Sequence, residues 1–340
     1  MPALGTRVTS VTQDNLLPFV VDTILGSNVF ATRALGSAKK WSGERTRFPV
    51  KVSKNSTGTS FSGCATFSTS ATNNRQVLSY DPKFYQITVA LPLDELSANQ
   101  TDDKVIDLAG VELLGAAHDM ADDIGILFYA DGTGNSSKDF LGLTALVDDG
   151  TNVANIKGVS RSTYSSLQGT VTASGGTLTL ALMQNLYNAA ASGSQRPTLG
   201  LCTEAVFNFY EQLLNPQERI SKDVPQMKNG LVGGSGVVGL FFRGVPVLAD
   251  ERATAQQLAF INENFLDFYA LPMAMSEPVK FKSVDIRGND YSSVLGLGFS
   301  WSGWIKPSNQ AAVVSHIYLG GELVTSGPDK HSRLTGITGV

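Results

Sequence analysis

The sequence is poor in cysteine and in charge, and each shortage excludes a class of protein. It holds only two cysteines, Cys64 and Cys202, among 340 residues. Two are too few for the disulfide framework of a small secreted domain, and a reducing compartment is expected. Charged residues make up 16% of the chain, the net charge is -4, and lysine and arginine form no cluster. A dedicated nucleic-acid binder, which must neutralise many phosphates, is therefore not expected.

Long hydrophobic runs are also missing. The best candidate, residues 237–249, is interrupted by Arg243 and falls short of the ~20 apolar residues that a membrane helix needs. The first residues contain no apolar segment of the kind found in a secretory signal. We therefore expect neither a membrane span nor a signal for export.

Patterns that carry catalytic chemistry are sparse. His118, His316 and His331 show no metal-ligand spacing, and phosphate-loop and nucleophile-elbow patterns are absent. Residues 234–239 match a dinucleotide-binding pattern, but β-rich residues follow where that motif requires a helix. The sequence thus predicts no catalytic site, no cofactor and no metal.

Two groups of side chains allow more than one interpretation. The acidic pairs at 122–123 and 148–149 would suit acid–base chemistry only in a pocket, and we expect them to be solvated on a helix face and in a turn. Trp301 and Trp304 could form a sugar-binding platform or a core patch. The alternation around them is typical of a half-buried strand, which favours the core.

The most informative positive feature is a long amphipathic segment at 101–129. Thr101 is the expected N-cap, and Gly110, Gly115 and Gly125 interrupt the pattern. Each glycine costs about 1 kcal/mol relative to alanine, so we predict that they serve close packing or act as bend points. At 1.5 Å per residue the helix would span roughly 40 Å and act as a spine. The apolar residues recur at steps of four and three: Val105, Ala109, Leu113, Ala116, Met120, Ile124 and Leu127.

A turn is predicted directly after this helix. Residues 131–135 read Asp-Gly-Thr-Gly-Asn, and residues 140–143 read Phe-Leu-Gly-Leu. The first stretch lacks the alternating ligands and the final glutamate of a calcium loop. We therefore assign structural roles in the turn to five residues: Asp131, Gly132, Gly134, Asn135 and Gly142.

An extended β-hairpin is predicted at 45–93. Residues alternate with period two at 47–52 and again at 84–90, which predicts one strand running out and one running back. Between them, residues 55–74 carry no charge and are mostly Ser, Thr, Gly and Asn. An isolated ribbon is marginal in water, so this one must rest on its own domain or on a neighbouring subunit. The candidate assembly contacts are Phe61, Phe67, Phe84 and Tyr85.

The remaining segments are predicted in less detail. Residues 1–44 are too poor in apolar groups to form a core and are interpreted as an arm lying on another surface. Helices are expected at 177–191 and 203–214. Strands are expected at 198–202, 237–242, 244–248, 258–261, 279–286, 293–305 and 311–319.

This order of parts resembles the major capsid proteins of tailed bacteriophages, which have the Hong Kong 97-type shell fold. The most specific parts of the resemblance are residues 130–135 followed by 141–143, and the Arg-Gly-Val-Pro-Val strand at 243–247. The resemblance implies an α+β fold in five parts: an N-terminal arm (1–44), an extended loop (45–93), a peripheral domain (94–165 and 306–340), its spine helix (about 101–129) and an axial domain (166–305).

The resemblance also implies a function. Such a chain is a structural protein and not an enzyme, and it self-assembles into hexamers and pentamers of an icosahedral shell around packaged double-stranded DNA. The extended loop of one subunit would lie over the spine of its neighbour. Besides other copies of the chain, the expected partners are a portal, a separate or already removed scaffold and, in some members, a decoration protein. DNA would be non-specific content, and the virion shell would assemble in the cytoplasm of a host bacterium.

Two alternatives remain open at this stage. The first is a cell-encoded, encapsulin-like nanocompartment with the same fold, which would need an inner site for cargo peptides. The second is a β-rich carbohydrate-binding module or enzyme that uses the strand with Trp301 and Trp304. Genes encoded nearby would distinguish the first alternative from a phage capsid protein. Polymeric behaviour in solution would argue against the second alternative.

Overall fold

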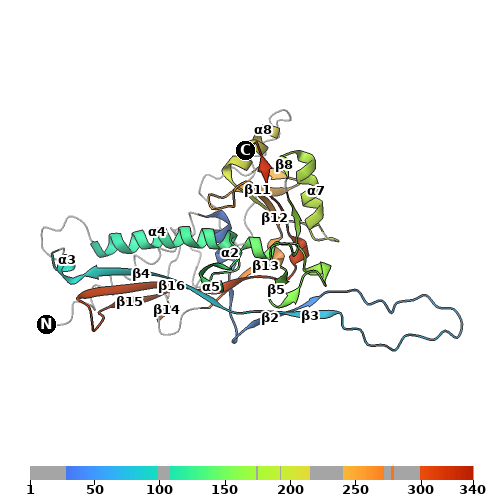
Figure 1. The fold of residues 1–340 in the computed structure, drawn as a ribbon, viewed down its shortest axis with the longest axis horizontal. Helices are drawn as coiled ribbons and strands as arrows, with labels where there is room; N and C mark the ends of the chain where they lie inside the picture. The colour runs from blue at the N-terminus through green and yellow to red at the C-terminus, as the bar shows by residue number, and fades with distance from the viewer. Residues whose placement is uncertain are drawn as a thin grey trace, which may run out of the picture.

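The computed structural model describes residues 28–98, 108–173, 175–191, 193–214, 240–271, 277–278 and 299–339. Helix α4 (Leu108–Tyr129) runs beside a long, mostly antiparallel sheet, and a second sheet with its helices stands at one end of that layer. A β-ribbon projects from the same end, away from the start of α4 (Figure 1). The molecule is therefore extended, with one long arm of helix and sheet and one long hairpin.

The long sheet is centred on strand β16 (Ala312–Thr325), which is longer than the predicted 311–319. It pairs with β4 (Lys83–Pro92) in one register from Ala312 opposite Pro92 to Gly321 opposite Lys83. The other strands of this sheet are β1 (Lys39–Lys40), β13 (Leu266–Ala270), β14 (Glu277–Pro278) and β15 (Phe299–Ile305).

Helix α4 packs on this sheet through the apolar stripe that the sequence predicts. Leu113, Met120 and Ile124 are buried, and α4 contacts β4. The helix ends at Tyr129 as expected. Residues 101–107, which contain the predicted N-cap Thr101, lie outside the described residues.

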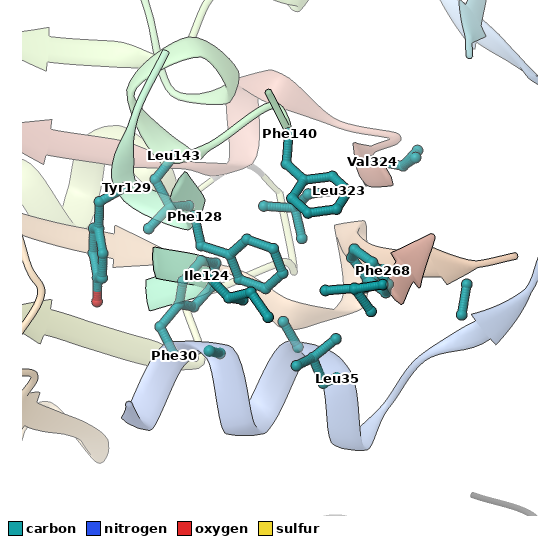
Figure 2. Close-up of a cluster of buried hydrophobic side chains, with 14 of the residues drawn as sticks. Phe30, Leu35, Ile124, Phe128, Tyr129, Phe140, Leu143, Phe268, Leu323 and Val324 are labelled. Atoms are coloured by element: carbon teal, nitrogen blue, oxygen red, sulfur yellow. The ribbon is translucent and has the colours of Figure 1, made fainter. Parts of the chain in front are cut away.

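A single aromatic core joins α4 to three other parts of the chain (Figure 2). Phe30 of helix α2 (Val29–Gly36) packs against Phe128 of α4 with ring centroids 6.0 Å apart. Phe128 in turn contacts Phe140 and Phe268. Residues 28–36 of the predicted arm therefore belong to the subunit's own core, which corrects that part of the arm prediction. Residues 1–27 lie outside the described part of the chain.

The second sheet contributes to two cores: Leu201, Leu248 and Ile261 belong to the core of the long sheet, and other side chains form a separate core with the sheet's helices. Helix α7 (Leu180–Ala190) is capped by Thr179, whose hydroxyl accepts the Leu182 N–H at 3.2 Å. Helix α8 (Glu204–Leu214) packs on β11. The strands, in spatial order, are β10 (Leu240–Phe242), β11 (Val245–Ala249), β9 (Leu199–Cys202), β12 (Leu258–Ile261), β17 (Ser332–Leu334) and β7 (Thr170–Thr172). The bounds of α7, α8, β9, β11 and β12 agree with the predicted elements, whereas β7 and β17 were not predicted. The strand predicted at 279–286 lies outside the described residues.

The sheets cut across the predicted domain boundaries. Strands β13, β14 and β15 come from the predicted axial segment 166–305, yet they lie in the sheet of β4 and β16. Strand β17 comes from the predicted peripheral segment 306–340, yet it pairs with β12 and β7 in the second sheet. The division into peripheral and axial domains stays a proposal, and it has to follow sheet membership instead of these segments.

The predicted pairing of the hairpin is wrong. Strand β2 (Thr46–Lys51) pairs with β3 (Arg75–Tyr80), whereas β4, predicted as the returning strand, pairs with β16. Only the turn at Asp81 and Pro82 separates β3 from β4. The period-two pattern of β4 arises because one of its faces is covered by α4. The projecting ribbon is therefore residues 46–80, called the hairpin below.

Candidate assembly surfaces

The tip of the hairpin contributes nothing to the subunit's own core. Phe61 and Phe67 have exposed fractions of 66% and 59%. Their rings contact each other edge to face, with centroids 5.1 Å apart. Cys64 lies between them in sequence and is also exposed. A charge-free segment that exposes two aromatic rings can gain stability by burying them on another molecule, about 1.5 to 3 kcal/mol for each ring.

The stem of the hairpin has two different faces. Phe48 packs against Tyr80 and Tyr269 with centroids 6.1 and 5.5 Å apart, and Leu78 beside them is fully buried. This face fixes the stem on its own subunit. The outward face is exposed and combines cations with apolar groups: Arg47, Pro49, Lys51, Arg75 and Val77.

Phe84 and Tyr85, the other two candidate assembly contacts, lie on β4 and not on the hairpin. Phe84 is 46% exposed and lines a pocket with Leu127 and Phe140. The Tyr85 hydroxyl donates to the Asp123 carboxylate of α4. Burial and this hydrogen bond raise the pKa of Tyr85. Tyr85 is thus held within the subunit, and Phe84 is the one of the two that is free to contact a neighbour.

The outer face of α4 is unpartnered in the described structure. Val111 and Ile126 are 49% and 51% exposed, and Glu112 and Asp119 are exposed beside them. Asp122 forms an ion pair with Arg252 at 2.8 Å. The acidic residues of α4 therefore lie at its surface, as expected, although Asp122 and Asp123 have partners inside the subunit.

The three glycines of the predicted bend have different surroundings. Gly110 is partly exposed, and Gly115 is exposed with nothing within 4 Å of a Cβ placed there. Gly125 is buried, and a Cβ would lie 2.5 to 2.8 Å from the side-chain atoms of Asn28. Gly125 therefore serves close packing with the segment that begins α2. A role in bending stays a prediction for Gly110 and Gly115.

The residues assigned to the turn after α4 lie in one compact loop. The Asp131 carboxylate accepts the Thr133 N–H at 3.0 Å and its hydroxyl at 2.7 Å, which lowers the pKa of Asp131. Asn135 has φ 50° and Gly132 has φ 74°, both left-handed. The other two glycines permit close approach: a Cβ would meet the Asp139 carboxylate at Gly134 and the Ala130 carbonyl at Gly142.

The loop is anchored to the long sheet by charged groups that sequence reasoning missed. The Lys83 ammonium donates to the carbonyl oxygens of Ser137 and Asp139. Glu322 of β16 is fully buried, accepts the Leu141 N–H at 2.7 Å and pairs with Lys157 at 3.3 Å. Burial raises the pKa of Glu322, and the cation and the hydrogen bond oppose that shift. The sequence offers one signal of these buried charged groups, which is the position of Glu322 inside an apolar strand.

A second buried charge cluster corrects the expectation for Asp148, which is not solvated. Asp148 and Arg161 are fully buried, and Arg333 is 4% exposed. Arg333 donates to the Asp148 carboxylate at 3.1 Å, and the Gly150 and Val153 amides donate to it at 2.9 Å each. Burial alone would raise the pKa of Asp148, but the hydrogen bonds from the Val153 and Gly150 amides and the charge of Arg161 lower it. Because Arg333 belongs to β17, the cluster fixes the loop that contains Asp148 on the second sheet.

The tryptophan strand is part of the core. Trp301 is 2% exposed, and its indole N–H donates to the Ser315 hydroxyl at 2.5 Å. Trp304 packs against the same core and is partly buried. A sugar platform on this strand is not supported. Within the described ranges no helix is long and apolar enough to cross a membrane. No three His, Cys, Asp or Glu side chains of the described residues are grouped to hold a metal ion.

Comparison with known proteins gives a result only at the level of structure. No family model matches the sequence, and no curated protein matches it. Solved structures do match. The capsid subunit of cyanophage A-1(L) superposes with a TM-score of 0.69 at 15% identity, covering 92% of this chain and 93% of that one. The chain has the Hong Kong 97-type shell fold.

Two further structures show how broadly this fold is shared. The capsid of a native GTA particle matches with a TM-score of 0.58 at 13% identity, covering 91% of each chain. The SrpI encapsulin of Synechococcus elongatus PCC 7942 matches with a TM-score of 0.55 at 12% identity, covering 88% of this chain and 84% of that one. Identities this low establish the fold and leave the function of the chain undecided.

Proposed function

We propose that this chain is the major capsid protein of a tailed bacteriophage and self-assembles into hexamers and pentamers of an icosahedral shell around packaged double-stranded DNA. The observation that carries the proposal is the similarity to the cyanophage capsid subunit over 92% of this chain and 93% of that one. The exposed hairpin tip and the unpartnered face of α4 support it. Both are surfaces that a second subunit would cover.

The mechanism is multivalent assembly and involves no chemical step. Each contact made by a hairpin or helix face is weak and reversible on its own, so a misplaced subunit dissociates. In a closed shell every subunit is held by many such contacts at once, and the lattice persists. The buried charge clusters around Asp148 and Glu322 keep each subunit rigid enough to repeat one geometry.

The partners of the proposed shell protein follow from this role. They are other copies of the chain, a portal at one vertex, a scaffold during assembly and, where the shell needs it, a decoration protein. Packaged DNA is enclosed without specific recognition, in keeping with the net charge of -4. The particle is a virion shell that assembles in the cytoplasm of the host bacterium.

A second candidate, an encapsulin-like nanocompartment, is favoured by the match to the SrpI encapsulin. Composition of purified particles separates the two. A phage shell yields nuclease-protected DNA when made with its portal and packaging enzymes, and its gene lies near theirs. A nanocompartment yields a co-purified cargo enzyme and no protected DNA. If no particle of either kind formed under any assembly condition, both candidates would be contradicted.

A further inference from the structure

A fully buried glutamate lies where the hairpin leaves its own subunit. Strand β3 ends at Tyr80 and β4 begins at Lys83, so these two residues bracket the corner at which the hairpin departs. Lys83 is opposite Gly321 in the register of β4 and β16, and Glu322 is the next residue beyond this pair. Glu322 is 0% exposed. A buried charge at this corner has to be balanced by its surroundings.

The balancing cation comes from the tight turn between β5 (Asn155–Ile156) and β6 (Val159–Ser160). The Lys157 ammonium lies 3.3 Å from the Glu322 carboxylate, and only 13% of the lysine side chain is exposed. The same ammonium lies 5.1 Å from the centroid of the Tyr80 ring, a distance typical of a cation–π contact. Lys157 thus connects β16 with the last residue of β3, at the root of the hairpin (Figure 1).

The turn holds Lys157 in a conformation that a lysine seldom adopts. Lys157 has φ 45° and Gly158 has φ 85°, and Ile156 pairs with Val159 on either side of them. Two central residues with positive φ form the hairpin turn in which Asn-Gly is preferred. A lysine at the first of these positions is sterically strained. The contacts of its ammonium offset the strain, which indicates that the turn serves to bring a cation to Glu322.

A second lysine holds the other side of the corner. Lys83 donates to two carbonyl oxygens of the loop after α4. Burial lowers the pKa of Lys83, the charge of Glu322 opposes this shift, and the charge of Lys157 adds to it. The carboxylates of Asp139 and Asp81 also oppose the shift, with smaller effects than Glu322. The two lysines therefore repel each other, and the Glu322 carboxylate is the main anion that offsets their repulsion.

Protonation of Glu322 favours the departure of Lys157. Burial raises the pKa of Glu322 above its ordinary value of 4.5, while Lys157, the Leu141 N–H and Lys83 hold it down. Tyr80 also lies beside Glu322 and stays neutral, because burial raises its pKa. If Lys157 leaves while Glu322 stays buried in β16, the pKa of Glu322 rises further. The released state then binds the proton more tightly, so proton uptake shifts the equilibrium toward release.

This titration does not itself unfold the subunit. In the unfolded chain Glu322 has its ordinary pKa, which is lower than its pKa in the folded subunit. The folded subunit therefore binds this proton more tightly than the unfolded chain does, and its stability does not fall as Glu322 is protonated. Release of Lys157 is thus expected in a subunit that remains folded.

We propose that Glu322, Lys157 and Lys83 form a latch that fixes the angle of the hairpin on its own subunit and opens when Glu322 takes up a proton. At neutral pH the anion holds both lysines, and Lys157 holds the Tyr80 ring. In mild acid the lysines face a neutral carboxyl, Lys157 moves into solvent, and the hairpin is free to turn about residues 81–82. The latch lies within one subunit, so this inference goes beyond the proposed function and does not depend on it.

Energy transfer between two dyes measures the angle of the hairpin in the full-length chain. Cys64 at the tip is exposed and Cys202 is buried, so a dye attaches selectively to Cys64. The second dye is attached through Glu211→Cys, because Glu211 is exposed on α8 and lies outside the hairpin. Single labelled molecules, diluted into unlabelled protein, are measured at about pH 7 and about pH 4.5. Circular dichroism at both pH values confirms that the protein is folded.

Three variants separate the latch from other effects of acid. Glu322→Gln removes the charge and keeps the size of the side chain, and a two-site variant adds Lys157→Met. Glu263→Gln is the matched control, because the ion pair of Glu263 with Arg33 at 2.6 Å involves no residue of the hairpin. The wild type and the control should show a shift of the efficiency peak in acid. Glu322→Gln should show the shifted peak already at pH 7.

The two-site variant should keep the neutral peak at both pH values, because a methionine at position 157 packs on the Tyr80 ring and leaves no pair of lysines to repel each other. A wild-type peak that does not move in acid would overturn the latch. So would a Glu322→Gln variant that starts from the neutral peak and shifts in acid as the wild type does.

The remaining outcomes also decide. A shifted peak at pH 7 in both Glu322→Gln and the two-site variant would show that Glu322 positions the corner through its hydrogen bond from the Leu141 N–H and not through its charge, which overturns the latch. A chain that shows the expected pattern and never assembles would refute the proposed shell function and leave the latch standing.

Discussion

At the scale of single residues, Gly115 and Gly125 provide a matched pair on one helix. A Cβ at position 125 would collide with the buried Asn28 side chain, whose amide donates to the Ala121 carbonyl at 2.8 Å. Gly125→Ala should therefore lower the free energy of unfolding by roughly 1 to 3 kcal/mol. Gly115→Ala meets nothing within 4 Å and should raise it by up to about 1 kcal/mol through helix propensity. Urea unfolding of both variants measures the difference.

The opposite order of stabilities would contradict this account of α4. If Gly125→Ala were the more stable variant, the Asn28 side chain could move at little cost in free energy. Close packing of α2 on α4 would then not explain why position 125 is a glycine. The bend hypothesis is separate and now concerns only Gly110 and Gly115. To test it, the size of particles assembled from a variant with alanine at both positions is compared with that of wild-type particles.

His331 should make subunit stability depend on pH. It is fully buried, its Nδ1 accepts the Asn262 N–H at 3.2 Å, and burial with a smaller effect from Lys330 lowers its pKa from 6.5 to about 3. A histidine whose folded pKa is lowered stabilises the fold fully above the unfolded value. As pH falls below about 6.5 the unfolded chain takes up the proton first, so stability should decline by about 1.4 kcal/mol per pH unit until about pH 3.

Urea unfolding between pH 7 and pH 4 checks this dependence. His331→Gln should remove most of the pH dependence that His331 gives to the free energy of unfolding. The stability of this variant should therefore approach that of the wild type as pH falls. His118→Gln is the control, because His118 is exposed on α4. Parallel curves for the wild type and the His331 variant would show that His331 already titrates normally in the folded subunit.

The surroundings of a single residue can be predicted from the sequence where nearby residues determine them, and cannot be where a distant residue does. The turn at Asp131 is stabilised by its own neighbours, two residues away, and its pattern is visible in the sequence. The burial of Asp148 depends on Arg333, 185 residues later. Two adjacent aspartates in a polar stretch look solvated, and nothing near them in the sequence indicates a distant cation.

At the scale of elements, the same distinction separates α4 from the hairpin. The helix was predictable because its apolar stripe has a period that only a helix satisfies, and its end at Tyr129 matches. Strands β3 and β4 both alternate with period two, and alternation does not say which strand pairs with which. The sequence therefore predicts the returning strand at 84–90, where the apolar pattern is strongest, whereas the strand that pairs with β2 is at 75–80.

Deleting the hairpin tip should separate folding from assembly. The stem is already closed before the tip begins, because the Val52 N–H donates to the Asn74 carbonyl at 2.9 Å and Ser53 contacts the Asn74 side chain. Replacing residues 54–73 by Asn-Gly, which favours a tight two-residue turn, should leave the thermal melting of the subunit nearly unchanged. Shell yield should fall sharply, since Phe61 and Phe67 lose the surface they bury on a neighbour.

Circular dichroism and electron microscopy together check the deletion. A full-length Phe61→Ser, Phe67→Ser variant is the control for loop length, and it should show the same loss of shells. An unfolded deletion variant would mean that the tip belongs to the subunit's core. Normal shells from both variants would mean that the tip does not join subunits.

At the scale of the whole molecule, the subunit is shaped for contact over a large area. Its described structure has two cores, the larger of which includes side chains from both sheets, a projecting hairpin and a long helix with one open face. Such a shape is poorly suited to a free monomer and well suited to a lattice in which every projecting surface is covered.

Cryo-electron microscopy of the purified full-length chain under assembly conditions tests the central claim most directly. The account predicts closed shells built from five-fold and six-fold capsomers, in which the hairpin of each subunit lies over α4 of the next. A monodisperse species of the single-chain mass, 36.1 kDa, that persists at high concentration and in salts that strengthen apolar burial would contradict it.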